Sequence, residues 1–293
     1  MPRPRGRYSP VVMRIAAEHG IDLESVTGTG RGGRVRKQDV LALVGDDKPE
    51  PPMHIESPYR PDPPAPKAAP APAPAAMPAG SSGPLPRMRQ MIGKAMVQSL
   101  QTAATCTTIV EADMSAVERV RAELGVTYLP VIARATVETL REFPTLNATL
   151  EGDTFTTYDT VNLGIAVSLG TGGLIVPVIH DAQELSIEGL AARIKDLARR
   201  GRDNQLTPDE VRGGTFTITN PGGYGSIIAT PVINQPQVAI LDTEAVVKRA
   251  VVVDDAIAIR PMTYLCMSWD HRALDGALAA QFLASLRDRL QQM

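Results

Sequence analysis

The sequence has few cysteines, few aromatic residues, no charge excess and no long apolar run. Only Cys106 and Cys266 occur among 293 residues, too few for a disulfide framework, so a reducing cytoplasm is the expected compartment. Aromatic residues make up 4% of the chain and the net charge is -2, which together argue against a nucleic-acid binder. Because no apolar run approaches the length of a bilayer span and no apolar stretch follows the charged start, neither a membrane protein nor a secretory signal is expected.

Proline is concentrated in one part of the chain and divides it. Twelve of the 25 prolines lie between Gly45 and Gly83, mixed with alanine. Proline breaks helices, and alanine supplies too little apolar surface for a core. In polyproline II form this segment would span on the order of 100 Å. The pattern predicts a small domain over 1–44, a flexible linker over 45–83 and a large domain over 84–293.

The small domain reads as two helices around a glycine-rich loop. Ser9 and Pro10 are typical of a helix start, and a second helix is expected over 36–44. The loop, GTGRGGRV, has neither a preceding strand nor the Lys-Ser/Thr of a P-loop, so nucleotide binding is disfavoured. A tight loop that presents Arg31 and Arg34 to an acidic protein surface is the preferred interpretation.

The large domain alternates helix and strand patterns, which predicts a mixed α/β fold with a large, partly antiparallel sheet. The expected helices cover 87–100, 131–143 and 186–200, and a last one begins near Asp275. The expected strands are 105–114, 161–169, 174–179, GGTFTITN, ATPVIN, QVAIL, KRAVVV and AIAIRPMTYLCMSW. A capping-box pattern at 207–210 predicts a further short helical turn.

The segment SWDHRALDG places His271 where a strand ends and a helix begins. The imidazole group has an unperturbed pKa near neutrality and can take and return a proton. A structural histidine that caps the helix is an equally good interpretation of the spacing alone. Asp275 follows four residues later, beside Gly276.

A second segment, GGTFTITNPGGYGS, alternates Thr215, Thr217 and Thr219 along one strand face. This alternation is typical of a half-exposed strand. A threonine hydroxyl here could also stabilise an oxyanion, and the spacing does not decide between the two.

Two further sites are considered and disfavoured. Cys266 lies near His271, but within the apolar strand TYLCMSW, which favours a buried core cysteine over a nucleophile. His19, His54 and His180 are scattered and have no cysteine spacing beside them, so no metal site is expected.

The region from residue 85 to the end resembles the catalytic domain of the acyltransferase (E2) component of 2-oxo acid dehydrogenase complexes. The matching pieces, in the family's order, are IVEADM, FPTLNATL, GIAVSLGTGGLIVPVI, GGTFTITNPGGYGSIIATPVINQPQVAIL and SWDHRALDG. Residues 8–44 resemble the family's peripheral subunit-binding domain, and the Ala/Pro segment is similar to its linkers. The resemblance implies a chloramphenicol-acetyltransferase-like fold, homotrimers, and active sites at subunit interfaces.

The resemblance also implies a function, a dihydrolipoyllysine-residue acyltransferase (EC 2.3.1 class) that moves an acyl group between dihydrolipoamide and coenzyme A without a metal. His271 matches the general base of the DHRxxDG motif, and Thr219 matches the hydroxyl that stabilises the oxyanion, contributed from a neighbouring subunit. Asp275 matches the motif's aspartate, which the family pairs with an arginine, here expected to be Arg89. Residues 8–44 are expected to bind E1 or E3, with Arg14, Arg31 and Arg34 at the contact.

The sequence departs from the family pattern at four places. No lipoyl domain precedes residues 8–44 in this sequence, so either a lipoyl group is expected in trans from another chain or the sequence is truncated. Met13 stands where a basic residue is usual, and Asp242-Thr243-Glu244 stands where glycine-rich sequence is expected. The chain ends soon after its last helix, which predicts a trimer that does not assemble further. The alternative function is a non-catalytic scaffold subunit that binds E3 or E1.

Overall fold

The computed structural model describes residues 8–44, 80 and 82–293. The chain divides into two units, Met1–Ala79 and Gly80–Met293. The predicted linker over 45–83 lies outside the described residues except at 80, 82 and 83, so its extended form stays a prediction. Among the described residues, no helix combines the length and the apolar composition that crossing a bilayer requires.

The first unit contains two short helices, α1 (Pro10–Glu18) and α2 (Lys37–Leu41). The predicted cap is confirmed, because the Ser9 hydroxyl accepts a hydrogen bond from the backbone N–H of Val12 at 3.4 Å. The second helix is shorter than the predicted 36–44. A small core of valines and one alanine holds the helices together, namely Val12, Ala16, Val26, Val35 and Val40.

The glycine-rich loop of this unit is packed against itself. A Cβ atom at Gly28 or Gly30 would lie 2.5 Å from backbone atoms of Arg34, so both positions require glycine. The Asp39 carboxylate accepts hydrogen bonds from the hydroxyl and backbone N–H of Thr29, at 2.7 and 2.9 Å. These bonds lower the pKa of Asp39, the Thr29 hydroxyl most of all. The loop is therefore a rigid turn that presents Arg31 and Arg34, both exposed, to the outside.

A seven-stranded mixed sheet forms the centre of the second unit, in the order β1-β11-β9-β8-β4-β7, with β10 also paired to β11. The strands β4, β8 and β9 run parallel, and the other pairs are antiparallel. Its strands are β1 (Thr105–Asp113), β4 (Leu163–Ile165), β7 (Val178–Ile179), β8 (Phe216–Thr219), β9 (Ala239–Thr243), β10 (Val247–Val253) and β11 (Ala256–Asp270). Two small sheets pair β2 (Ala148–Glu151) with β3 (Thr154–Thr157), and β5 (Val167–Ser168) with β6 (Leu174–Ile175).

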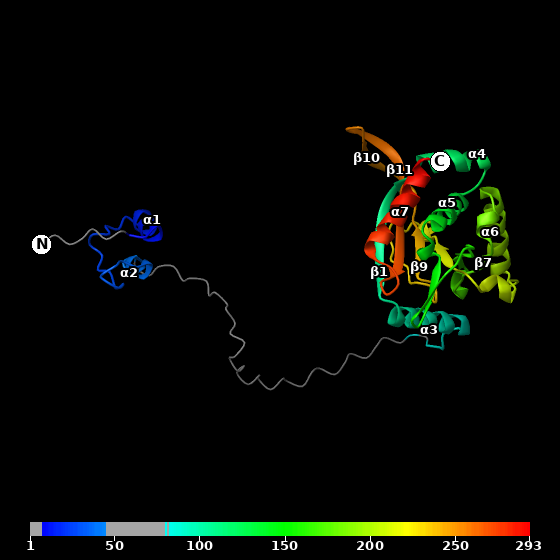
Figure 1. The fold of residues 1–293 in the computed structure, drawn as a ribbon, viewed down its shortest axis with the longest axis horizontal. Helices are drawn as coiled ribbons and strands as arrows, with labels where there is room; N and C mark the ends of the chain where they lie inside the picture. The colour runs from blue at the N-terminus through cyan, green and yellow to red at the C-terminus, as the bar shows by residue number, and fades with distance from the viewer. Residues whose placement is uncertain (1–7, 45–79, 81) are drawn as a thin grey trace. The chain divides into compact units, whose positions relative to one another are not determined.

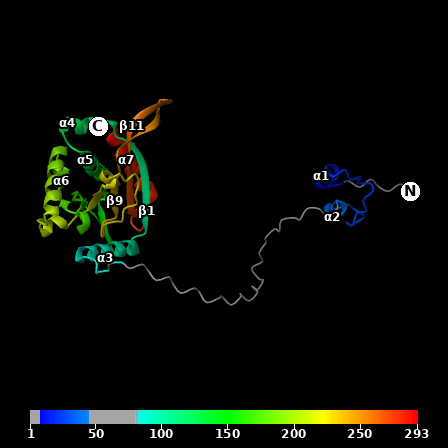
Figure 2. The same ribbon diagram turned by 180° about the vertical axis from the view of Figure 1, so that it is seen from behind.

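The helices of the second unit are α3 (Arg87–Thr102), α4 (Ser115–Leu124), α5 (Tyr128–Glu142), α6 (Ile187–Arg202) and α7 (Gly276–Gln291). Helix α7 packs on β1, and α5 packs between α6 and α7, so these helices cover one face of the sheet (Figures 1 and 2). Phe216 of β8 and Phe282 of α7 lie fully buried between them. In both views the β10–β11 hairpin extends from one end of this unit and α3 lies at the other.

Most predicted elements are confirmed, but the expected strands 161–169 and 174–179 are each divided between two sheets, and two further expectations are wrong. The segment ATPVIN forms no strand, because Pro231 has no N–H for a ladder and the segment is held instead by the Ser99 hydroxyl, which donates to the Ile233 carbonyl at 2.6 Å. The face of β8 expected to be half exposed is buried at Thr215 and Thr217. Helix α4 was not predicted.

Candidate active site

His271 lies at the turn between β11 and α7, as the sequence predicts. Its backbone N–H donates to the Ala104 carbonyl at 2.9 Å. Its ring lies 4.8 Å from that of Trp269, whose indole N–H donates to the Thr108 hydroxyl at 3.0 Å. Trp269 is buried whereas His271 is exposed, so a fixed aromatic platform presents an accessible imidazole at the end of the sheet.

The aspartate before His271 holds this turn together, a role that the sequence analysis missed. Asp270 is 1% exposed. Both its carboxylate oxygens accept from Nε of Arg272 at 3.0 Å, and Oδ2 accepts from Nη2 at 2.6 Å. Oδ1 also accepts from the backbone N–H of Ala104 at 3.1 Å. Burial acts to raise the pKa of Asp270, but the hydrogen bonds from Arg272 outweigh it and the pKa is lowered. The acidic and basic residues that flank His271 in the D-H-R segment were the sequence signal for this ion pair.

Asp275 caps α7. Its Oδ1 accepts from the backbone N–H of Leu278 at 2.9 Å, so the helix cap is Asp275 and not His271. Arg89 lies in the first turn of α3 and is exposed. The pairing of Asp275 with Arg89 stays a prediction.

Thr219 is the last residue of β8 and is half buried. It lines a cavity of about 420 Å³ together with Asn220, Pro221 and apolar side chains such as Ile165 and Ile194. Its carbonyl accepts a hydrogen bond from the Thr243 hydroxyl at 3.5 Å. A hydroxyl at a strand end beside a partly apolar cavity is suited to contact a bound ligand.

The sheet register keeps Thr219 and His271 apart within one chain. Thr219 aligns with Asp242 of β9, which aligns with Cys266 of β11. His271 is five residues further along, beyond the opposite end of β9. At about 3.3 Å per residue and 4.8 Å per strand, the two Cα atoms are on the order of 20 Å apart. They therefore cannot act on one bond in one chain.

The other two threonines of this segment, Thr215 just before β8 and Thr217 within it, are structural. The Thr215 hydroxyl donates to Asn147 Oδ1 at 2.6 Å, and the Thr217 hydroxyl donates to Gln237 Oε1 at 2.7 Å. Both threonines are buried. These bonds satisfy polar atoms inside the sheet, which explains why the threonine alternation does not mark an exposed face.

Cys266 is completely buried, as expected of a core cysteine. Burial is the main cause that raises the pKa of its thiol, and a thiol held protonated is a poor nucleophile. Among the described residues, no group of three or more His, Cys, Asp and Glu side chains is placed to hold a metal ion.

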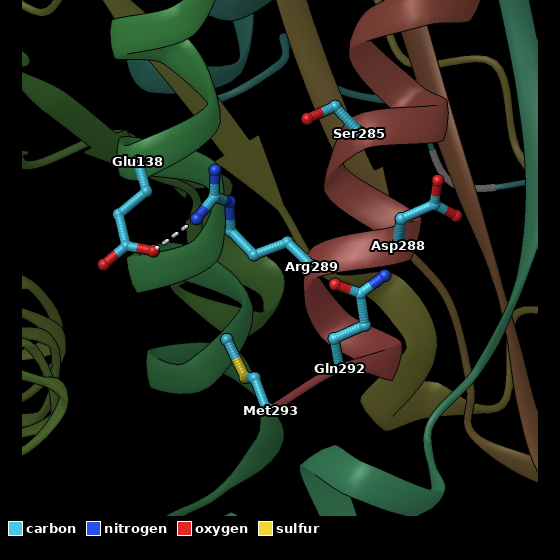
Figure 3. A pocket seen from close by; sticks show the side chains of 6 residues that line it. All are labelled: Glu138, Ser285, Asp288, Arg289, Gln292 and Met293. Carbon is cyan, nitrogen blue, oxygen red and sulfur yellow. Dashed lines mark hydrogen bonds and ion pairs between the residues drawn. The ribbon is translucent and has the colours of Figure 1, made fainter.

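A second cavity, of about 680 Å³, lies between α5 and the end of α7 (Figure 3). Its lining includes Arg289, which donates to Glu138 at 3.1 Å, together with Ser285, Asp288 and Met293. None of the predicted site residues lines it. Two other polar side chains of its wall are engaged as well, Ser285 with Glu142 and Asp288 with Arg287.

The expected partner-binding residues of the first unit, Arg14, Arg31 and Arg34, are all exposed. Met13, which stands at the position of an expected basic residue, is 49% exposed. The first unit therefore exposes an apolar side chain directly beside a basic one, Arg14.

Comparisons with known proteins extend this picture to both units. The family model of the 2-oxoacid dehydrogenases acyltransferase catalytic domain matches residues 78–293. The model of the E3-binding domain matches residues 6–41.

Two curated relatives and one solved structure illustrate the similarity. The acetyltransferase component of the pyruvate dehydrogenase complex of Corynebacterium glutamicum is 41% identical, over 97% of this chain and 43% of the relative. The lipoamide acyltransferase component of the branched-chain alpha-keto acid dehydrogenase complex of Bacillus subtilis is 37% identical, over 98% of this chain and 71% of the relative. The chain thus spans less than half of the first relative.

The solved structure is a dihydrolipoamide acetyltransferase of Azotobacter vinelandii, which superposes with a TM-score of 0.69 at 31% identity, over 72% of this chain and 91% of the other. That structure was determined to examine the roles of a serine, a histidine and an asparagine in the catalytic mechanism. The predicted mixed α/β fold is confirmed by this superposition.

Proposed function

The chain belongs to the family of 2-oxoacid dehydrogenase acyltransferases, and on this premise we propose that it transfers an acyl group between dihydrolipoamide and coenzyme A. The observation that carries the proposal is the turn at the end of β11, where the buried Asp270–Arg272 pair and the Trp269 ring hold an exposed imidazole, that of His271. No metal is assigned to the reaction.

His271 is the proposed general base. The thiolate is the reactive form of a thiol, so neutral imidazole accepts the proton of the attacking substrate thiol as sulfur adds to the thioester carbonyl. The carbon–sulfur bond to the departing thiol then breaks, and the imidazolium returns the proton to that sulfur. The exposure of His271 allows long thiol substrates to reach it from outside the chain.

Thr219 is the proposed oxyanion donor, contributed by a neighbouring copy of the chain. A separation on the order of 20 Å within one chain excludes direct cooperation with His271 of the same copy. In the Azotobacter protein the serine and the histidine are 52 residues apart and the asparagine follows four residues later. Thr219, His271 and Asp275 have the same spacings, which supports the assignment of the three positions. Asparagine and aspartate are both good helix N-caps, in accord with a structural role for Asp275.

Self-association, proposed as a homotrimer, is supported by apolar side chains that the single chain leaves exposed. On α3 these include Met91, Val97 and Leu100, at 55–60% exposure. At the tip of the β10–β11 hairpin, Ile257 and Ile259 are 83% and 72% exposed. Several large apolar side chains left exposed on one element are typical of an interface.

The first unit is the proposed docking site for E3 or E1. Its match to the E3-binding domain and its exposed arginines, Arg14, Arg31 and Arg34, support an acidic partner surface. The lipoyl group is proposed to arrive on a lipoyl domain of another chain, and the cytoplasm is the proposed compartment.

The test is acyl transfer to free dihydrolipoamide from acetyl-, succinyl- and isobutyryl-coenzyme A. We expect His271→Ala to lower kcat about 10²- to 10⁴-fold, and Thr219→Val to lower it about 10²-fold or more. Thr219→Ser should retain most activity because it keeps the hydroxyl. His180→Ala, which removes another exposed histidine of the same unit, is the matched control.

Folded, self-associated protein without turnover on any donor would contradict the proposal. It would favour the alternative, a non-catalytic scaffold that binds E3 or E1, which the E3-binding match alone would explain.

A further inference from the structure

Two acidic side chains are buried at the end of β9 that lies beside Thr219. Asp242 is 1% exposed and Glu244 is 4% exposed. They are two residues apart in extended backbone, so both side chains lie on the same face of the sheet. Both carboxylate oxygens of Glu244 and one of Asp242 are buried without a hydrogen-bond partner among the described residues. Buried carboxylates without partners are strongly disfavoured, so this pair requires an explanation.

Among the described residues, no lysine, arginine or histidine forms an ion pair with either acid. The segment 220–237, which covers this face, contains no Lys, Arg, His, Asp or Glu. On β11, the titratable groups opposite the pair are Cys266 and Tyr264. Tyr224 in the covering segment is 83% exposed, and the charged residues of α3, Arg87, Arg89 and Lys94, are exposed as well.

Further along the same face of the sheet, Arg249 is engaged elsewhere. It donates to Glu111 at 3.1 Å and its guanidinium lies 4.5 Å from the ring centroid of Tyr264. The charged residue nearest to Asp242 in the sequence is Glu244, which has the same sign.

A proton is the one partner that satisfies both groups. Two ionised carboxylates offer acceptors only, whereas a protonated carboxyl group donates a hydrogen bond to its neighbour. Burial, and after it the neighbouring Glu244 carboxyl group, raise the pKa of Asp242 to about 7. Below that pH the pair carries a single negative charge, like other carboxyl pairs that share a proton.

The pair lies directly against the parts that orient Thr219. Asp242 is in register with Thr219 across the parallel β8–β9 pairing, and the Thr243 hydroxyl between the two acids donates to the Thr219 carbonyl. The turn after Thr219 presses on the same backbone, since a Cβ atom at Gly222 would lie 2.3 Å from the Glu244 carbonyl carbon. Movement of either acid therefore displaces Thr219 or its turn.

We propose that Asp242 and Glu244 share one proton and act as positioning residues, which hold the end of β9 in the geometry that orients Thr219. The role in catalysis rests on the proposed function, whereas the shared proton does not. When the second carboxyl group ionises, repulsion between the two buried charges moves β9 and the turn.

The first experiment compares the pH dependence of unfolding in the full chain and in Asp242→Asn. The pKa of Asp242 is 3.8 when unfolded and about 7 when folded. The folded chain therefore binds the extra proton, and stability is lost as pH rises through this interval. Relative to the variant, the wild-type unfolding constant should rise about tenfold per pH unit between pH 4 and pH 7. Glu244→Gln should reduce this slope too, and Asp159→Asn, at an exposed position, should leave it unchanged.

Equal slopes in wild type and Asp242→Asn would overturn the proposal. If the variants do not fold, the infrared spectrum of the wild type decides. The carbonyl stretch of a protonated carboxyl group should be present at pH 6, where exposed carboxyl groups are ionised, and should disappear above pH 8. Its absence at pH 6 would also overturn the proposal.

The second experiment tests positioning through acyl-transfer kinetics. The ratio of wild-type to Asp242→Asn kcat should be constant below pH 6 and fall above it by up to about 10²-fold, the cost of one oxyanion donor. The KM ratio should stay constant. A kcat ratio that does not change with pH would overturn the positioning role. A chain without any turnover would refute the proposed function but leave the unfolding and infrared results intact, so the two failures are distinguishable.

Discussion

The two ends of the central sheet treat a buried carboxylate in opposite ways. At the His271 end, Asp270 is satisfied by Arg272 and two backbone N–H groups, and its pKa is lowered. At the Thr219 end, Asp242 is equally buried but faces Glu244, and its pKa is raised. Burial alone therefore does not set the charge of an aspartate. The partners decide, and here they lower the pKa of the aspartate at one end of the sheet and raise that of the aspartate at the other.

The largest effect is expected from removal of the charge at the His271 end. Asp270→Asn weakens several charged hydrogen bonds to a side chain that is 35% exposed, so the free energy of unfolding at pH 8 should fall by about 2–4 kcal/mol. The same substitution at Asp242 should stabilise the chain at that pH. Urea unfolding of Asp270→Asn and Asp242→Asn at pH 8 measures both changes in the free energy of unfolding. Destabilisation by both substitutions would contradict the expected difference between the two ends of the sheet.

The next effect concerns the turn at the Thr219 end. Gly222→Ala forces a Cβ atom onto backbone atoms of Glu244 and Ala245, whereas a Cβ atom at Gly223 meets nothing within 4 Å. Gly222→Ala should therefore cost about 1–3 kcal/mol and lower acyl transfer. Gly223→Ala is the matched control. Similar unfolding midpoints for the two variants would show that the turn is not tightly held.

The smallest effect is expected at Glu210, a carboxylate at the periphery of the fold. Its pKa is set by its hydrogen-bond partners and not by burial. Hydrogen bonds from Arg200 lower the pKa of Glu210 to about 2, below its ordinary 4.5. Its stabilisation is therefore present above pH 4.5 and is lost as pH falls toward 2. Glu210→Gln should lower the free energy of unfolding by less than about 1 kcal/mol at pH 7. It should also reduce the acid limb of the stability profile, that is, the loss of stability as pH falls from 4.5 toward 2. Thermal unfolding from pH 2 to pH 7 tests this, and an unchanged acid limb would contradict it.

Local features were predictable from the sequence because they depend on neighbouring residues. Ser9 and Asp275 cap helices as the residue types indicate, and β11 is a run of β-branched and apolar residues. Pro231 already indicated that ATPVIN would not form a strand of the sheet, because proline has no N–H to donate. Asp270 and Arg272 flank His271 in the DHR motif, so their pairing could be predicted without a structure.

Non-local features were not predictable. Thr215 and Thr217 are buried because Asn147 and Gln237 arrive from distant segments to bond them. The separation of Thr219 from His271 depends on which strands are neighbours and in what register. The sequence shows Asp242 and Glu244 as a departure from glycine, but only the fold shows that both are enclosed under a segment without charges.

The long strand β11 gives the chain a gradient of mobility. Residues 262–270 pair with β1, and 265–269 among them also pair with β9 on the other side, whereas 256–261 pair with β10 alone. Backbone amides near His271 should therefore exchange with solvent hydrogen only when much of the unit opens, and those near the hairpin tip should exchange through brief local fluctuations. One continuous strand is thus expected to join a slowly exchanging region, which ends at the imidazole, to a rapidly exchanging one.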